Sequence, residues 1–130
     1  MADDNEQKAI EEEFSQSWDG QEIFFKLHSA FEGWEWLAAI FDLIADLRSR
    51  GYDRKFRAGQ NMDIFRLSRS REHGLRLEQP SLSFALNDKG GMTVNYYENN
   101  NTVTELEIAS VEITPEIEAL LTRLLAQPID

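Results

Sequence analysis

The sequence predicts an α+β fold, an antiparallel β-meander of three to four strands with helices packed on one face. Three observations lead to this fold class. Apolar residues recur every three or four positions in the first 50 residues and again after residue 114, as in amphipathic helices. Between residues 81 and 113 they alternate with polar residues instead, as in strands with one buried face. Short turn-forming segments separate the alternating runs, and such hairpin connections make neighbouring strands antiparallel.

The composition is that of a single folded domain over residues 1–130. Apolar residues make up 42% of the chain and aromatic residues 11%, too much for a disordered chain. The absence of cysteine excludes disulfides, thiolate metal sites and cysteine nucleophiles. The start of the chain lacks the features of a signal peptide, and no apolar run approaches the roughly 18 residues of a membrane span. We therefore expect a cytoplasmic protein that contacts no membrane.

Two helices are expected in the N-terminal region. Over residues 5–18 the apolar side chains are four positions apart and form a narrow stripe: Ile10, Phe14 and Trp18. Residues 1–20 are thus predicted to form an acidic N-terminal helix, packed as an outer helix or held as a loose arm. A second helical face before Gly33 carries Ile23, Phe24, Leu27 and Phe31. Residues 22–27 also fit a strand.

A third helix is predicted from Trp34 to Arg50. Its apolar residues keep the helical period: Leu37, Ile40, Phe41, Ile44 and Leu47. Basic residues occupy the last turn, and Gly51 follows in the position of a left-handed cap. Trp34 and Trp36 could form an aromatic binding platform, but such large rings beside an apolar helix are expected to pack in the core or at its rim.

Residues 81–113 are predicted to form the strands of the meander. A hairpin around the turn at 88–91 has these inward residues: Leu82, Phe84, Leu86, Met92, Val94 and Tyr96. A second turn at 99–101 is favoured because Asn tolerates positive φ. Leu106 and Ile108 then alternate with glutamates. The apolar phase shifts before Val111 and Ile113, which predicts a β-bulge near residues 109–110.

A C-terminal helix is predicted to begin after Thr114. Thr114 suits the N-cap, and Pro115 suits the first helical position. The inner face of this helix is expected to carry Ile117, Leu120, Leu121, Leu124 and Leu125. The helix should end before Pro128, since proline cannot continue it.

Residues 61–73 fit two different structures. A helix would begin at an Asn61 cap and end before Gly74. It would bring three basic side chains to one face: Arg66, Arg69 and His73. A strand would instead point Phe65 and Leu67 inward and add a fourth strand beside residues 82–86. The sequence leaves both structures open.

Charge is divided unevenly along the chain. The formal net charge is -11, yet residues 48–76 hold nine basic and three acidic residues, a local charge of +6. The remaining residues hold four basic and 21 acidic residues, a charge of -17. Such separation creates a local positive potential that orients partners more than it attracts them.

The sequence contains no recognisable catalytic or metal-binding motif. The only histidines are His28 and His73, and His28 with Glu32 would supply just two metal ligands. No serine lies in a nucleophile elbow, and the glycines at 90–91 have the position of a hairpin turn rather than the spacing of a phosphate loop. We therefore expect no enzyme activity, no cofactor and no metal ion.

The arginine-rich segment 48–76 has three interpretations. Its arginines could pair internally with glutamates such as Glu105, Glu107 and Glu112. They could instead bind a protein partner or a second copy, since arginine is enriched at interfaces. They could also contact phosphates of a nucleic acid or a phosphorylated ligand, although the net charge opposes a polyanion. An acidic mimic that blocks a basic protein fits the rest of the chain but not this segment.

We expect a small non-catalytic protein-binding domain, an adaptor or regulator, with nucleic-acid or phosphorylated-ligand binding as the alternative. A purely internal network would not need its arginines gathered in one segment, which narrowly favours an interface. The residues expected to contact the partner are Arg54, Arg57, Arg66, Arg69, Arg71, His73 and Arg76.

Overall fold

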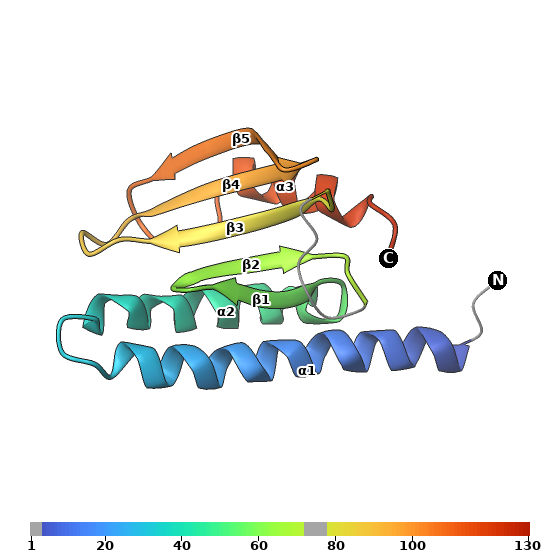
Figure 1. The fold of residues 1–130 in the computed structure, drawn as a ribbon, viewed down its shortest axis with the longest axis horizontal. Coiled ribbons are helices and arrows are strands. Elements are labelled where there is room, and N and C mark those ends of the chain that lie inside the picture. The colour runs from blue at the N-terminus through green and yellow to red at the C-terminus, as the bar shows by residue number, and fades with distance from the viewer. Residues whose placement is uncertain (1–3, 72–77) are drawn as a thin grey trace.

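The computed structural model describes residues 4–71 and 78–130. Its elements form a five-stranded antiparallel sheet with helices before and after it (Figure 1). The strand order β1-β2-β3-β4-β5 means that each strand pairs with the next one along the chain. The predicted α+β class and antiparallel meander are confirmed, whereas the predicted number of three to four strands is too low. Among the helices described, none has the length and apolar character to cross a membrane.

Helix α1 (Asp4–Ser29) is one continuous helix, where the sequence pattern predicts two. Gly20 lies in its interior, and a glycine there costs about 1 kcal/mol relative to alanine. Burial of Phe14, Trp18 and Phe25, all at most 1% exposed, outweighs this cost because each large side chain contributes about 2 kcal/mol or more. Residues 22–27 are therefore helical, and their strand alternative is wrong.

The predicted helix from Trp34 to Arg50 consists of two parts. A 3₁₀-helix, η1 (Glu35–Ala39), leads directly into α2 (Ile40–Ser49). Gly51 follows with a φ of 84°, which confirms the expected left-handed cap. A short 3₁₀-helix, η2 (Tyr52–Arg54), then brings the chain to the sheet.

Strand β2 (Ile64–Ser68) shows that, within the described part of residues 61–73, the strand alternative is the right one. Phe65 and Leu67 are fully buried on the inner face, and Arg66 between them faces the other side of the sheet. The preceding strand, β1 (Arg57–Asn61), pairs with β2 through a tight turn at Met62. Sequence patterns do not predict β1, because RAGQN contains no β-branched or aromatic residue.

The predicted hairpin and third strand are present as β3 (Ser81–Leu86), β4 (Met92–Glu98) and β5 (Asn101–Ile108). Asn99 and Asn100 form the second turn with φ values of 51° and 62°. The predicted bulge near residues 109–110 is wrong. The register shifts at Tyr96 and Tyr97 instead, and the phase change after Ile108 reflects a chain that has left the sheet.

Helix α3 (Pro115–Leu125) begins and ends as predicted. The Thr114 hydroxyl accepts a hydrogen bond from the Ile117 N–H at 3.2 Å, and Pro115 occupies the first turn. This cap satisfies one of the free N–H groups at the helix start.

A single hydrophobic core lies between the three α-helices and the inner face of the sheet. The ring centroids of Trp18 and Phe25 in α1 lie 5.4 and 6.2 Å from that of Phe65 in β2. Leu121 of α3 and Ile44 of α2 belong to the same buried cluster. The helices therefore share one face of the sheet, with α1 beside β1 and α3 against β3 (Figure 1).

Helix α1 also covers the free edge of the sheet at β1. The Ser17 hydroxyl accepts a hydrogen bond from the Ala58 N–H at 2.9 Å. The Trp18 indole N–H donates to the Phe56 carbonyl oxygen, also at 2.9 Å. An uncovered edge strand would offer unpaired backbone groups to other chains, and these contacts reduce that exposure.

Candidate functional site

Two of the arginines predicted to bind a partner, Arg69 and Arg71, are engaged inside the molecule. Arg69 Nε donates to the Gln127 carbonyl oxygen at 3.0 Å, and burial lowers the pKa of Arg69. Arg71 Nε lies 3.0 Å from a Glu13 carboxylate oxygen, and its Nη1 lies 3.4 Å from Glu6. Arg69 therefore connects the C-terminal tail to the end of β2, and Arg71 connects the first half of α1 to it.

Arg48 occupies the centre of a second internal network. Its guanidinium nitrogens lie 3.1 Å from Asp19, 2.7 Å from Glu22 and 3.2 Å from Asp53. Burial lowers the pKa of Arg48, but hydrogen bonds to Glu22 and Asp19 more than offset this effect and the pKa is raised overall. Because the carboxylates come from α1 and η2, Arg48 joins α2 to both elements.

The observed arginine pairs differ from those of the internal interpretation. Within the part of the chain that the structure describes, Glu105, Glu107 and Glu112 form no salt bridge. Glu105 and Glu107 lie on β5, at the opposite edge of the sheet from β1. Helix α1 lies beside β1, so its carboxylates reach the arginines first.

Arg57 and Arg66 border a hollow of about 240 Å³ over β1 and β2. Its other lining residues are Gln21, Ala58, Gly59, Gln60 and Ser68. Gly59 pairs directly with Arg66 and supplies no side chain. A Cβ atom at Gly59 would meet nothing within 4 Å, so the space beside it is open.

Neither arginine of the hollow forms a salt bridge with any carboxylate of residues 4–71 and 78–130. Arg57 Nη1 donates to the Arg71 carbonyl oxygen at 3.1 Å. The Arg66 guanidinium carbon lies 4.7 Å from the centroid of the Tyr97 ring, and its buried Nε makes no hydrogen bond with a described residue. Two cations without a carboxylate partner among the described residues make the hollow a candidate site for an anionic group.

Of the remaining predicted site residues, Arg54 does not line the hollow. Arg54 is exposed, and its side chain forms no hydrogen bond or ion pair with the described residues. His73 and Arg76 lie outside the described residues.

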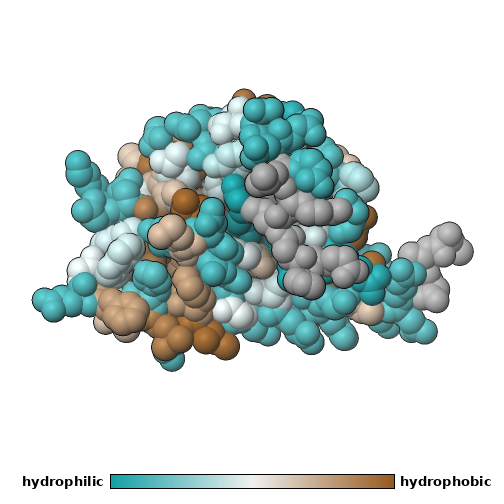
Figure 2. All heavy atoms as spheres, in the orientation of Figure 1, coloured by the Kyte–Doolittle hydropathy of each residue, from teal (hydrophilic) through white to brown (hydrophobic). Residues whose placement is uncertain are grey.

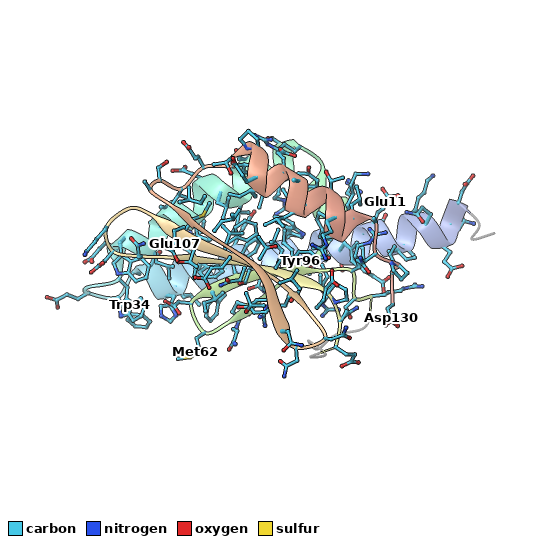
Figure 3. The ribbon with its side chains drawn as sticks, turned by 90° about the horizontal axis from the view of Figure 1, so that it is seen from above. Glu11, Trp34, Met62, Tyr96, Glu107 and Asp130 are labelled. Atoms are coloured by element: carbon cyan, nitrogen blue, oxygen red, sulfur yellow. The ribbon has the colours of Figure 1, made fainter. Side chains whose placement is uncertain are left out.

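Five large hydrophobic side chains are exposed around the C-terminal end of α1 and the turn between β1 and β2. We name them the apolar patch and give their exposed fractions here: Ile23 64%, Leu27 67%, Phe31 62%, Trp34 36% and Met62 78%. Figure 2 shows hydrophobic surface gathered at this end of the molecule. In Figure 3 the labelled Trp34 and Met62 lie at the same end, opposite Glu11 and Asp130.

Ring contacts hold the aromatic part of the apolar patch in place. The His28 ring centroid lies 5.9 Å from that of Phe31 and 4.9 Å from that of Trp34. The Trp34 centroid lies 5.5 Å from that of Trp36, whose indole N–H donates to the Gly33 carbonyl oxygen at 3.1 Å. Side chains fixed by such contacts lose less freedom when a partner binds.

The continuity of α1 explains why sequence reasoning did not identify the apolar patch. The sequence pattern places three of the exposed residues on the apolar face of a separate helix: Ile23, Leu27 and Phe31. In one helix each residue advances by about 100°, so Leu27 lies on the opposite side from Trp18, nine positions earlier. Phe25, seven positions after Trp18, returns to the buried side. Extending the first stripe through Gly20 would have revealed the exposed residues.

Carboxylates flank the apolar patch. Three of its residues are each followed directly in the chain by an acidic residue: Glu32, Glu35 and Asp63. We name these three the acidic rim, and none of them forms a salt bridge with a described residue. Lys26 is the only lysine or arginine in residues 19–36. The apolar patch therefore lies in an acidic surrounding, while Arg48 and Arg71 neutralise carboxylates elsewhere on α1.

Within residues 4–71 and 78–130, no group of three or more His, Asp or Glu side chains could hold a metal ion. The His28 ring instead packs against the rings of Phe24, Phe31 and Trp34.

In comparisons with known proteins, the chain matches no family model, no curated protein and no solved structure.

Proposed function

We propose that this chain is a non-catalytic protein-binding module, an adaptor or regulator, whose partner docks on the apolar patch. The observation that carries the proposal is the exposure of Ile23, Leu27, Phe31 and Met62, each more than 60% exposed. Water contact at these four side chains is unfavourable, and clusters of this kind mark interaction surfaces more often than isolated exposed residues do. Aromatic residues such as Trp34 are also enriched among the residues that dominate binding energy.

The occupant in this proposal is a different protein rather than a second copy. A second copy would bring two acidic rims together, each with Glu32, Glu35 and Asp63. Each chain also carries a net charge of -11, so repulsion between copies opposes self-association. A partner of another sequence avoids both costs.

The arginine-rich segment contributes less to the proposed binding surface than its number of arginines would predict. Arg48, Arg69 and Arg71 are occupied by contacts within the chain. Arg54 and Arg57 are among the arginines that no described carboxylate neutralises, but Arg57 begins β1 at the end of the strand remote from Met62 of the apolar patch.

The experiment is affinity capture from the native host with three baits: the parent, Leu27→Ser/Phe31→Ser, and Val103→Ser as a control. Val103 is an exposed apolar residue on β5, 45% accessible and outside the apolar patch. The captured protein is identified, purified and titrated against each bait. We expect the double variant to lose affinity by about tenfold or more, because it removes two central apolar contacts. Equal affinity of the double variant and the parent would contradict the proposal.

A second candidate function, binding of a phosphorylated ligand, is favoured by the hollow between Arg57 and Arg66. Phosphate oxygens accept several hydrogen bonds at once, which suits two guanidinium groups. The test is an NMR titration with inorganic phosphate at constant ionic strength, using Arg66→Gln, Gly59→Val and the control Arg54→Gln. Saturable shifts at β1 and β2 that vanish in the first two variants would support this candidate. Shifts that are linear, or equal in all variants, would reject it.

A further inference from the structure

We infer that the partner presents apolar side chains flanked by lysine or arginine, a surface complementary to the apolar patch and the acidic rim together. This inference rests on the proposed function, since it concerns the same surface. It goes further by stating the charge of the partner, which decides how fast and how selectively the two proteins associate.

The first argument concerns the cost of covering the acidic rim. Glu32 and Glu35 are exposed and Asp63 is half-buried, and no described cation neutralises them. A purely apolar partner would remove water from these carboxylates and leave them unpaired, which is unfavourable. Lysine or arginine at the border of the partner would replace the lost water contacts with charge-assisted hydrogen bonds.

The second argument concerns the distribution of charge over the molecule. At the end of α1 remote from the apolar patch, Arg71 neutralises Glu6 and Glu13. Arg48 neutralises Asp19 and Glu22 further along the same helix. The acidic rim has no such cation among the described residues, and it borders the residues of the apolar patch at the end where Figure 3 places Trp34 and Met62. Carboxylates that no described cation neutralises attract a basic surface to the border of the apolar patch.

The test uses three synthetic amphipathic peptides as probes. The first has a leucine and tryptophan face with lysines around it, and the second replaces every lysine by glutamate. The third keeps the lysines and replaces the apolar face by serine. Each is titrated against the parent, Leu27→Ser/Phe31→Ser, and the rim variant Glu32→Gln/Glu35→Gln/Asp63→Asn. A matched variant, Asp4→Asn/Glu12→Gln/Glu105→Gln, removes the same charge from exposed positions away from the apolar patch.

We expect the lysine peptide to bind the parent at least about tenfold more tightly than either other peptide, and the rim variant to lose about fivefold in association rate at low salt. The matched variant should keep the parent rate. The inference is overturned if the parent does not bind the lysine peptide, if the glutamate peptide binds equally well, or if both charge variants behave alike. Capture of an acidic protein that Leu27→Ser/Phe31→Ser no longer binds would overturn the inference alone and leave the proposed function standing.

Discussion

At the scale of single residues, the contacts of a side chain decide its role more than its type does. Arg48 and Arg54 lie in the same arginine-rich segment. Arg48 is 23% exposed and binds three carboxylates, whereas Arg54 is exposed and binds none of the described ones. Charge counts along the sequence cannot separate these cases, because the carboxylates of Arg48 come from residues up to 29 positions away.

Replacing Arg48 by Gln should therefore destabilise the fold, and replacing Arg54 by Gln should not. Arg48→Gln leaves Asp19, Glu22 and Asp53 without their cation, and we expect a loss of about 1–2 kcal/mol in the free energy of unfolding. Arg54→Gln should stay within about 0.5 kcal/mol of the parent. Urea unfolding of both variants measures the difference. Equal stability of the two would show that the Arg48 network is no stronger than an isolated surface pair.

Two tyrosines provide a matched test of buried hydroxyl groups. The Tyr52 hydroxyl donates to Glu118 at 2.9 Å, while the buried Tyr96 hydroxyl forms no hydrogen bond with the described residues. Tyr52→Phe should cost about 1 kcal/mol, and Tyr96→Phe should be neutral or stabilising, because it removes a buried hydroxyl that has no hydrogen-bond partner among the described residues. Thermal unfolding at neutral pH distinguishes the two. A larger loss of stability in Tyr96→Phe than in Tyr52→Phe would show that the Tyr96 hydroxyl makes a stabilising hydrogen bond.

The same tyrosines predict a loss of stability in alkaline solution. Burial raises the pKa of both Tyr52 and Tyr96 above the value of 10.0 for an unperturbed tyrosine. Well below pH 10 the tyrosines are neutral in both the folded and the unfolded state, and the contribution to stability is complete. As the pH rises toward the folded-state pKa, the unfolded tyrosines ionise first and stability falls. The double Phe variant should show a weaker decline between pH 9 and 11 than the parent, as measured by urea unfolding.

At the scale of elements, the residues that begin and end a helix could be read from the sequence. Whether two apolar stripes belong to one continuous helix could not. Thr114 and Pro115 define the start of α3 through contacts within four residues, and Gly51 ends α2 by its own backbone freedom. The two apolar faces predicted two helices, but the packing of Trp18 and Phe25 against Phe65 keeps α1 helical through Gly20. The apolar patch was hidden by this error.

Strands β1 and β2 also could not be predicted from local sequence signals alone. Residues 61–73 carry helix caps, yet Phe65 and Leu67 reach the core only as part of a strand beside β3. Strand β1 has a weak strand sequence and is held by β2 on one side and Ser17 of α1 on the other. Contacts between segments that lie far apart in sequence decide both elements. The hollow between Arg57 and Arg66 could not be predicted without them.

Two glycine substitutions test this account of α1 and α2. A Cβ atom would meet nothing within 4 Å at either Gly20 or Gly51, so packing does not separate them. Gly20→Ala should stabilise the protein by about 0.5–1 kcal/mol, because alanine favours a helix interior. Gly51→Ala should destabilise it by about 1 kcal/mol, because φ is 84° there. Chemical denaturation measures both, and a loss of stability in Gly20→Ala would contradict a continuous α1.

At the scale of the whole molecule, the two ends of α1 have different surroundings. The first half is fastened to the rest of the fold by Arg71, and Arg48 binds the middle. The last turns carry Ile23 and Leu27 of the apolar patch, at the end of the molecule where Figure 2 shows hydrophobic surface and Figure 3 labels Trp34 and Met62. Arg48 and Arg71 thus stabilise the fold along the first two thirds of α1. The exposed apolar surface lies at the other end of the helix, bordered by the acidic rim.

This division predicts that the apolar patch contributes little to folding. Leu27→Ser/Phe31→Ser should unfold within about 0.5 kcal/mol of the parent, since both side chains are more than 60% exposed. Leu121→Asp serves as the positive control. Leu121 is fully buried, and a carboxylate at its position should cost several kcal/mol. Calorimetry of the three proteins makes the comparison, and a large loss in the double variant would identify Leu27 and Phe31 as structural.

The most direct test of the apolar patch as a binding surface is site-specific photocrosslinking in the native host. A photoreactive amino acid replaces Leu27 in one protein and Glu12 in another, both exposed positions on α1, the second in the half remote from the apolar patch. We predict a discrete crosslinked adduct with one basic protein from Leu27 and none from Glu12. No adduct at Leu27, or the same adducts at both positions, would contradict the central claim.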